Sequence, residues 1–171
     1  MAFCLRSIFV PLYLVGSTGL YGQVASSKCV LPQEVQRASQ REFANWHLVT
    51  DKDFTASERR MWARYPDASC PGIIRGHFTG HDESTIAFAL LAPARTKEVI
   101  LLYTPSTKTL LTIVPAARMW LTVLYSVPPS DSSAIGGLKK EWDSVGSGPP
   151  EGLAIIHYWN GRRFQDEETG D

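Results

Sequence analysis

His77 and His81, together with the carboxyl groups that follow them, are the side chains whose types and spacing could carry chemistry. Imidazole acts as a general base and as a ligand for zinc, copper or nickel. An i, i+4 spacing brings two side chains together on a helix, whereas Gly80 between them favours a turn with two loop histidines. The catalytic hypothesis for this sequence is a small hydrolase or metal-dependent enzyme that uses His77, His81 and Asp82. We nevertheless expect no resident metal and no cofactor.

The segment around these histidines, from Cys70 to Phe88, reads CPGIIRGHFTGHDESTIAF. It resembles the FG-GAP type of repeat, in which a strand leads into an Asp-rich calcium loop and then into an apolar strand. In that pattern, roughly D-x-[DN]-x-D-G-x-x-D, oxygen ligands alternate along the loop. The ligand positions are occupied here by His77, Thr79, His81 and Thr85. Calcium prefers several carboxylates, so the resemblance implies a loop-and-strand shape that does not hold calcium tightly.

The sequence YWNGRRF, from Tyr158 to Phe164, is similar to the endings of uncharacterised exported bacterial proteins that carry this kind of loop. A single copy of the loop cannot build a propeller, which needs several blades. The resemblance therefore implies a local shape and no particular activity.

Serine chemistry has no sequence signature in this chain. A nucleophilic serine in G-x-S-x-G sits on a strand-to-helix turn, whereas the run from Gly146 to Gly148 lacks that spacing and is followed by two prolines. We therefore interpret residues 144–152 as a loop. His157 lies in a predicted strand beside two aromatic residues, where we expect a packed, hydrogen-bonded histidine. The chain also has no P-loop or dinucleotide fingerprint.

Cys29 and Cys70 are the two cysteines that remain once Cys4 is removed with a leader sequence. We predict that they form one disulfide, with two free buried thiols as the alternative. Neither has the C-x-x-C spacing of a redox motif or a zinc site. Trp142 is the candidate binding residue, because it stands among charged residues in a segment of uncertain structure and exposed aromatic side chains mark binding surfaces. A half-buried packing role is the alternative for this residue.

Residues 1–25 have the pattern of an export signal. One positive charge, Arg6, precedes an apolar core from Ile8 to Val15, and small residues follow at Gly22 and Ala25. This core of about 8 residues is shorter than the roughly 20 that span a bilayer, although an uncleaved membrane anchor is the alternative. We expect a periplasmic or secreted protein with no stable membrane span after signal cleavage.

The remaining residues, 26–171, have the length of a single domain. The chain is 44 % hydrophobic and 20 % charged, which indicates a folded protein. Arg6 is the only charge within residues 1–25, so 16 of the 17 basic residues remain against 17 acidic residues, a net charge of −1. This balance gives no reason to expect a nucleic-acid partner.

Two helices and a series of strands should position these residues. Thr55 and Glu58 form a capping box that begins a helix ending near Tyr65. Residues 32–43 can form a second helix, whose apolar stripe is narrower. Strands are expected at residues 46–49, 72–78, 85–91, 99–103, 109–114, 119–125, 153–159 and 162–165, because these runs are short and rich in β-branched or aromatic residues. Asn160 and Gly161 favour a type I′ hairpin turn. The tail, residues 166–171, should be acidic and frayed.

These patterns predict an α+β fold for a single domain. An antiparallel sheet of five to seven strands would carry one or two short helices, with the helix at 55–65 covering one face. The function that we expect is that of an exported, non-catalytic binding module with a protein or cell-envelope component as its partner.

Overall fold

The computed structural model describes residues 29–64, 70–80, 83–118, 121–129, 141–150 and 152–168. Within these ranges the chain is mostly antiparallel β-structure, with nine strands in two sheets and two short α-helices. The predicted signal, residues 1–25, lies outside the described residues. In the ranges that the structure does describe, no helix has the length and apolar character needed to cross a membrane.

The first sheet contains five strands: β1 (His47–Leu48), β2 (Ile73–Gly76), β3 (Thr85–Leu91), β4 (Lys97–Thr104) and β5 (Thr109–Arg118). The order is β1-β3-β4-β5, and β2 pairs with β3 along the same edge as β1. Every residue of β3 is buried, as its two-sided apolar sequence predicts for a central strand. The short connections between the strands agree with the antiparallel pairing.

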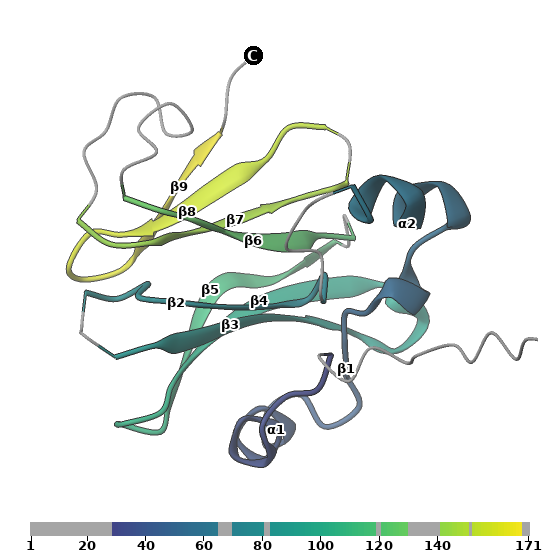
Figure 1. Ribbon diagram of the computed structural model, residues 1–171. Coiled ribbons are helices and arrows are strands. Elements are labelled where there is room, and N and C mark those ends of the chain that lie inside the picture. The colour runs from purple at the N-terminus through teal and green to yellow at the C-terminus, as the bar shows by residue number, and fades with distance from the viewer. Residues whose placement is uncertain are drawn as a thin grey trace, which may run out of the picture.

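The second sheet is a meander of four antiparallel strands: β6 (Val123–Val127), β7 (Ser144–Gly148), β8 (Ile155–Trp159) and β9 (Phe164–Glu168). Figure 1 shows this sheet lying over the first one as a second layer. The two layers are joined near β2 and β6, where the backbone N–H of Leu124 donates to the carbonyl of Pro71 at 2.7 Å.

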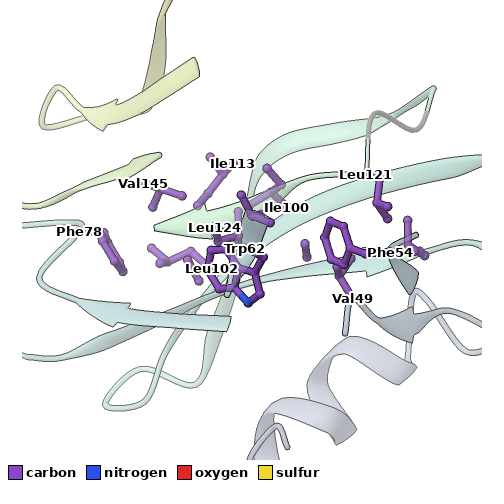
Figure 2. Packing of buried hydrophobic residues seen from close by; sticks show 14 residues of the cluster. Val49, Phe54, Trp62, Phe78, Ile100, Leu102, Ile113, Leu121, Leu124 and Val145 are labelled. Atoms are coloured by element: carbon purple, nitrogen blue, oxygen red, sulfur yellow. The ribbon is translucent and has the colours of Figure 1, made fainter. Parts of the chain in front are cut away.

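Two hydrophobic cores lie on the two faces of the first sheet. Ala87, Leu91 and Leu102 contribute to the core between the sheets, whereas their neighbours Phe88 and Leu101 contribute to the core on the outer face. This division follows from the alternation of side chains along a strand. Figure 2 shows the core between the sheets.

The helices occupy different places from those expected. Helix α1 (Gln33–Gln40) covers the outer face of the first sheet with Val35 fully buried, and α2 (Ala56–Trp62) lies beside the second layer (Figure 1). The capping box of α2 is confirmed, because Thr55 and Glu58 exchange their side-chain and backbone hydrogen bonds. Trp62 on the last turn of α2 reaches the core between the sheets. The helix that covers a sheet face is therefore α1, whose sequence has the narrower apolar stripe.

The antiparallel strands and the two short helices are confirmed, but the prediction of one sheet with five to seven strands was wrong. The described part of the chain has more strands, divided between two sheets. One of the added strands is β7, whose sequence SVGSG was interpreted as a loop. Glycine and serine have little intrinsic preference for strands, so β7 depends on its pairing with β6 and β8.

The last hairpin is confirmed, but its turn differs from the prediction. Trp159 pairs with Phe164, so the loop has four residues instead of the two of a type I′ turn. The side-chain oxygen of Asn160 accepts hydrogen bonds from the backbone N–H groups of Arg162 and Arg163, both at 3.0 Å. Strand β9 continues to Glu168, so the first three residues of the expected frayed tail are part of the sheet.

Candidate functional site

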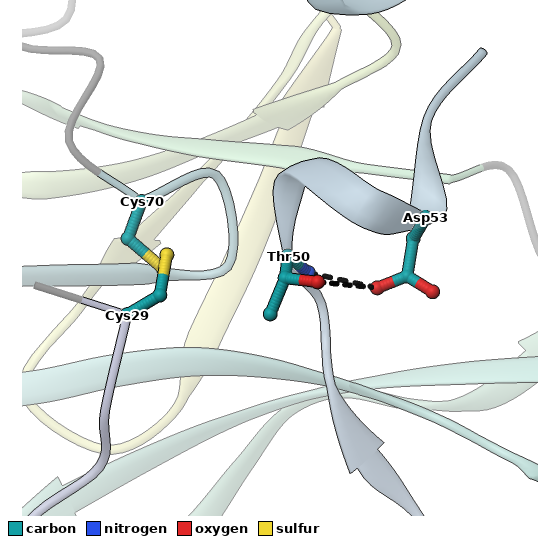
Figure 3. The surroundings of a disulfide bond; sticks show 4 residues. All are labelled: Cys29, Thr50, Asp53 and Cys70. Carbon is teal, nitrogen blue, oxygen red and sulfur yellow. Dashed lines mark hydrogen bonds between the residues drawn. A yellow bond between two sulfur atoms is a disulfide. The ribbon is translucent and has the colours of Figure 1, made fainter. Parts of the chain in front are cut away.

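The disulfide between Cys29 and Cys70 fixes the N-terminal arm to the start of β2. Their Cα atoms are 5.1 Å apart, within the usual range for a disulfide. Figure 3 shows the bond beside the short 3-10 turn at Asp51–Asp53. The structure thus contains the predicted pair, which joins residues 41 positions apart.

Asp53 holds the same turn in place. Its carboxylate accepts hydrogen bonds from the backbone N–H and hydroxyl of Thr50 at 2.9 and 3.2 Å, which the dashed lines of Figure 3 mark. It also contacts His47 at 3.0 Å and Arg95 at 2.9 Å. Burial raises the pKa of Asp53, but the hydrogen bonds and the neighbouring positive charge outweigh it and lower this pKa below its usual value. The carboxylate is a structural anion that ties the residues after β1 to the β3–β4 connection.

A groove lies between the N-terminal arm, α1 and the edge of the first sheet. Its cavity volume is about 230 Å³, and it opens to solvent. The apolar lining comes from the arm, from the segment after α1, and from the first sheet, and includes Val30, Phe43, Trp46, Leu48 and Leu90. The rings of Phe43 and Trp46 pack edge to face with centroids 5.1 Å apart. Val30 is 62 % exposed at the groove, so the lining offers apolar surface to solvent.

The histidine hypothesis falls largely outside the described residues. His77 is exposed at the end of β2, and its backbone N–H donates to the carboxylate of Asp143 at 2.8 Å. His81 and Asp82 are not described. Within the described ranges, no three His, Cys, Asp or Glu side chains gather as a metal site. A catalytic role for the three residues stays a prediction.

Trp142 is half-buried and contacts Gly80 in the loop after β2. A Cβ atom at Gly80 would lie 2.5 Å from the indole ring, and Gly80 has φ +80°, so this position requires glycine. Together with the bond from Asp143 to His77, this contact joins the start of β7 to the loop. Part of the Trp142 side chain is therefore committed to packing, and its role in binding stays a prediction.

Ser147, His157 and Asp166 come together on three neighbouring strands of the second sheet. Ser147 Oγ lies 2.6 Å from His157 Nε2, and His157 Nδ1 lies 2.6 Å from Asp166 Oδ1. His157 is paired with Val145 on one side and with Asp166 on the other. Paired residues share a face of the sheet, and Val145 belongs to the core between the sheets. We call these three residues the serine relay.

The hydrogen-bond roles in the serine relay follow from the chemistry of its members. A carboxylate only accepts, so Nδ1 of His157 carries the proton that is donated to Asp166. The other nitrogen, Nε2, then accepts from the hydroxyl of Ser147. Burial lowers the pKa of His157, against the opposing influence of the hydrogen bond and the charge of Asp166. The relay therefore holds a neutral imidazole whose lone pair points to a hydroxyl, the arrangement in which a histidine acts as general base toward serine.

The exposure of the serine relay changes from one end to the other. Ser147 is 5 % exposed and His157 is 1 % exposed, whereas the side chain of Asp166 is 63 % exposed. Ser147 is paired with Ile155 on β8, and Ile155 is 37 % exposed. Leu153, whose carbonyl lies close to Gly148, is 56 % exposed. Ser147 thus stands at the boundary between the packed core and an exposed apolar rim.

Sequence reasoning missed this relay because its members carry no common motif. It treated Ser147 as part of a flexible loop, His157 as a packed residue and Asp166 as part of a frayed tail. The expectation for His157 was correct as far as packing is concerned, since it is buried and hydrogen-bonded on both nitrogens. The one available signal was the last hairpin, because its pairing places Asp166 opposite His157. The length of the hairpin loop must be known before that pairing can be derived from the sequence.

Comparison with family models, curated proteins and solved structures finds no match to this chain.

Proposed function

We propose that this chain is an exported binding module that takes apolar side chains of a partner protein into the groove between its N-terminal arm and α1. The observation that carries the proposal is that Cys29, one end of the disulfide, is itself a lining residue of the groove. The disulfide holds the arm, and with it the exposed side chain of Val30, against the folded domain. A binding surface is then present before the partner arrives, which reduces the ordering cost of association.

The apolar character of the groove supports a protein partner. Large exposed aliphatic side chains beside a concave, aromatic-lined surface are typical of interaction sites. The charged residues that neighbour the lining residues in the sequence are of both signs, at Glu34, Arg37, Arg41 and Glu42, so no strongly charged ligand is favoured. A disulfide in the groove wall also agrees with the export signal predicted for residues 1–25, because such bonds persist in oxidising compartments.

The test is selection of binding peptides against the oxidised protein, purified from an export-competent host. Random peptides displayed on phage are selected, and the affinity of the best peptides is measured by fluorescence anisotropy for the wild type and for Val30→Asp. The matched control is Leu153→Asp, which changes a comparably exposed apolar side chain in the connection between β7 and β8, away from the groove. Both variants add the same charge to the protein.

We expect Val30→Asp to weaken the selected peptides by roughly tenfold or more, because a carboxylate placed against the apolar lining loses its hydration without a partner. Leu153→Asp should leave the affinity within about a factor of two. Reduction of the disulfide should weaken binding as well, since it frees Val30 and the chain before it, whereas Leu31 is buried in the core. Peptides that bind both variants and the reduced protein as well as the wild type would show that the groove is not the binding site.

A further inference from the structure

The serine relay has an arrangement of groups that a binding module does not need. We propose that Ser147 is a nucleophile, activated by His157 and oriented through Asp166, that accepts the acyl group of a small carboxylic ester with an apolar acyl chain. This activity is independent of the groove, which lies against the other sheet. The observations that carry it are the two consecutive hydrogen bonds of 2.6 Å and the apolar rim beside the serine.

The register of the strands accounts for the geometry. Ser147 lies two positions further along β7 than Val145, the residue paired with His157, so Ser147 and His157 are diagonal neighbours on one face. Asp166 is directly opposite His157 on β9. Backbone pairing therefore sets both distances, and neither depends on a flexible loop. A rigid support of this kind suits a group that must meet a substrate in a fixed geometry.

The surroundings of Ser147 define the substrate class. Its paired neighbour Ile155 and the preceding Leu153 expose apolar surface beside the serine. A short aliphatic acyl chain can pack on these two residues with its carbonyl carbon near Ser147 Oγ. Since Ser147 is only 5 % exposed, the site admits a small ester and rejects a bulky one.

The reaction follows the chemistry of the three groups. The hydroxyl oxygen of Ser147 forms a bond to the carbonyl carbon while its proton passes to Nε2 of His157. The bond from that carbon to the alkoxide then breaks, and the alkoxide leaves as an alcohol with the proton from Nε2. Water, deprotonated by the same nitrogen, then attacks the carbonyl carbon of the acyl-serine. The bond from that carbon to Ser147 Oγ breaks, Oγ takes the proton back from Nε2, and the carboxylic acid is released. Asp166 keeps Nδ1 protonated throughout and is a positioning residue.

The test uses an alkyl fluorophosphonate on the oxidised full protein at about pH 8, where His157 is neutral. In the labelling step Ser147 Oγ forms a bond to phosphorus, fluoride leaves and the proton passes to His157. Intact-mass and peptide mass spectrometry then count and locate the adduct. Ser144→Ala is the matched control, because Ser144 is a second buried serine on β7 whose side chain points to the opposite face. Hydrolysis of p-nitrophenyl butyrate is measured in parallel.

We expect one adduct on Ser147 in the wild type and in Ser144→Ala, and none in Ser147→Ala or His157→Gln. Asp166→Asn should slow labelling at least tenfold while the protein stays folded by circular dichroism, because the Asp166 side chain is mostly exposed. Ester hydrolysis should follow the labelling rates. The proposal is overturned if the folded wild type forms no adduct, if the adduct lies on another residue, or if Asp166→Asn is labelled at the wild-type rate, since a purely structural hydrogen-bond network would give those results.

Discussion

Reducing the Cys29–Cys70 disulfide should lower the free energy of unfolding by about 4 kcal/mol. The two cysteines are 41 positions apart, and the chain-entropy relation for a loop of that length gives roughly 13 cal/mol/K, or about 4 kcal/mol at 25 °C. We expect native contacts of the arm to limit any further loss, because Leu31 and Val35 are buried against the first sheet through contacts other than the bond. For a domain of this size, a loss of about 4 kcal/mol is a large part of the total stability.

The assay is urea unfolding followed by tryptophan fluorescence, with and without a phosphine reductant. Reduction leaves every side chain in place, so it separates the cross-link from the effects of substitution. A Cys29→Ala, Cys70→Ala double variant should agree with the reduced wild type within about 1 kcal/mol, since Cys70 is buried and its truncation leaves only a small gap. The dependence of the free energy on urea should also become steeper after reduction, because the unfolded chain is then less compact. A loss below about 1 kcal/mol on reduction would refute the reasoning.

Two more predictions follow from the second sheet. Because burial lowers the pKa of His157, the unfolded chain binds more protons than the folded chain below about pH 6.5, so the free energy of unfolding should fall on acidification from about pH 7 to about pH 5. Urea unfolding should show a steeper fall in Asp166→Asn, because this variant loses the interactions that raise the pKa of His157. If the free energy of unfolding of His157→Gln falls as much as that of the wild type, His157 is not the titrating group. Gly146→Ala would place a Cβ atom 2.2 Å from the ring of Tyr125, so we expect about 1–3 kcal/mol of destabilisation by thermal unfolding, and an unchanged melting temperature would disprove the close contact.

The sequence contained enough information for those elements whose residues alone favour one conformation. The strand from Thr85 to Leu91 was predicted with its observed bounds, because apolar residues on both faces indicate a buried strand. The capping box at Thr55 predicted the start of α2 for an equally local reason. Secondary structure of this kind depends on a few neighbouring residues, and the sequence shows those directly.

The division into two sheets could not be predicted in the same way. Strand β7, from Ser144 to Gly148, is the second strand of the second sheet, and its small residues favour a loop when considered alone. The strand exists because β6 and β8 supply its hydrogen bonds and because Gly146 leaves room for the ring of Tyr125. Without β7, β6 has no link to the last hairpin, and the chain reads as one sheet. The error in strand number and the error in sheet number therefore have one cause.

The turn of the last hairpin decides whether the serine relay can form. A two-residue turn at Asn160–Gly161 would pair Trp159 with Arg162, which places Phe164 opposite His157 and leaves the histidine without a carboxylate. The observed four-residue loop shifts the pairing by two positions, so the same face of β9 is kept while Asp166 comes opposite His157. Asn160 holds this longer loop through its side-chain oxygen. A residue that takes no part in the relay thus determines its geometry, which is why a motif search along the chain could not find it.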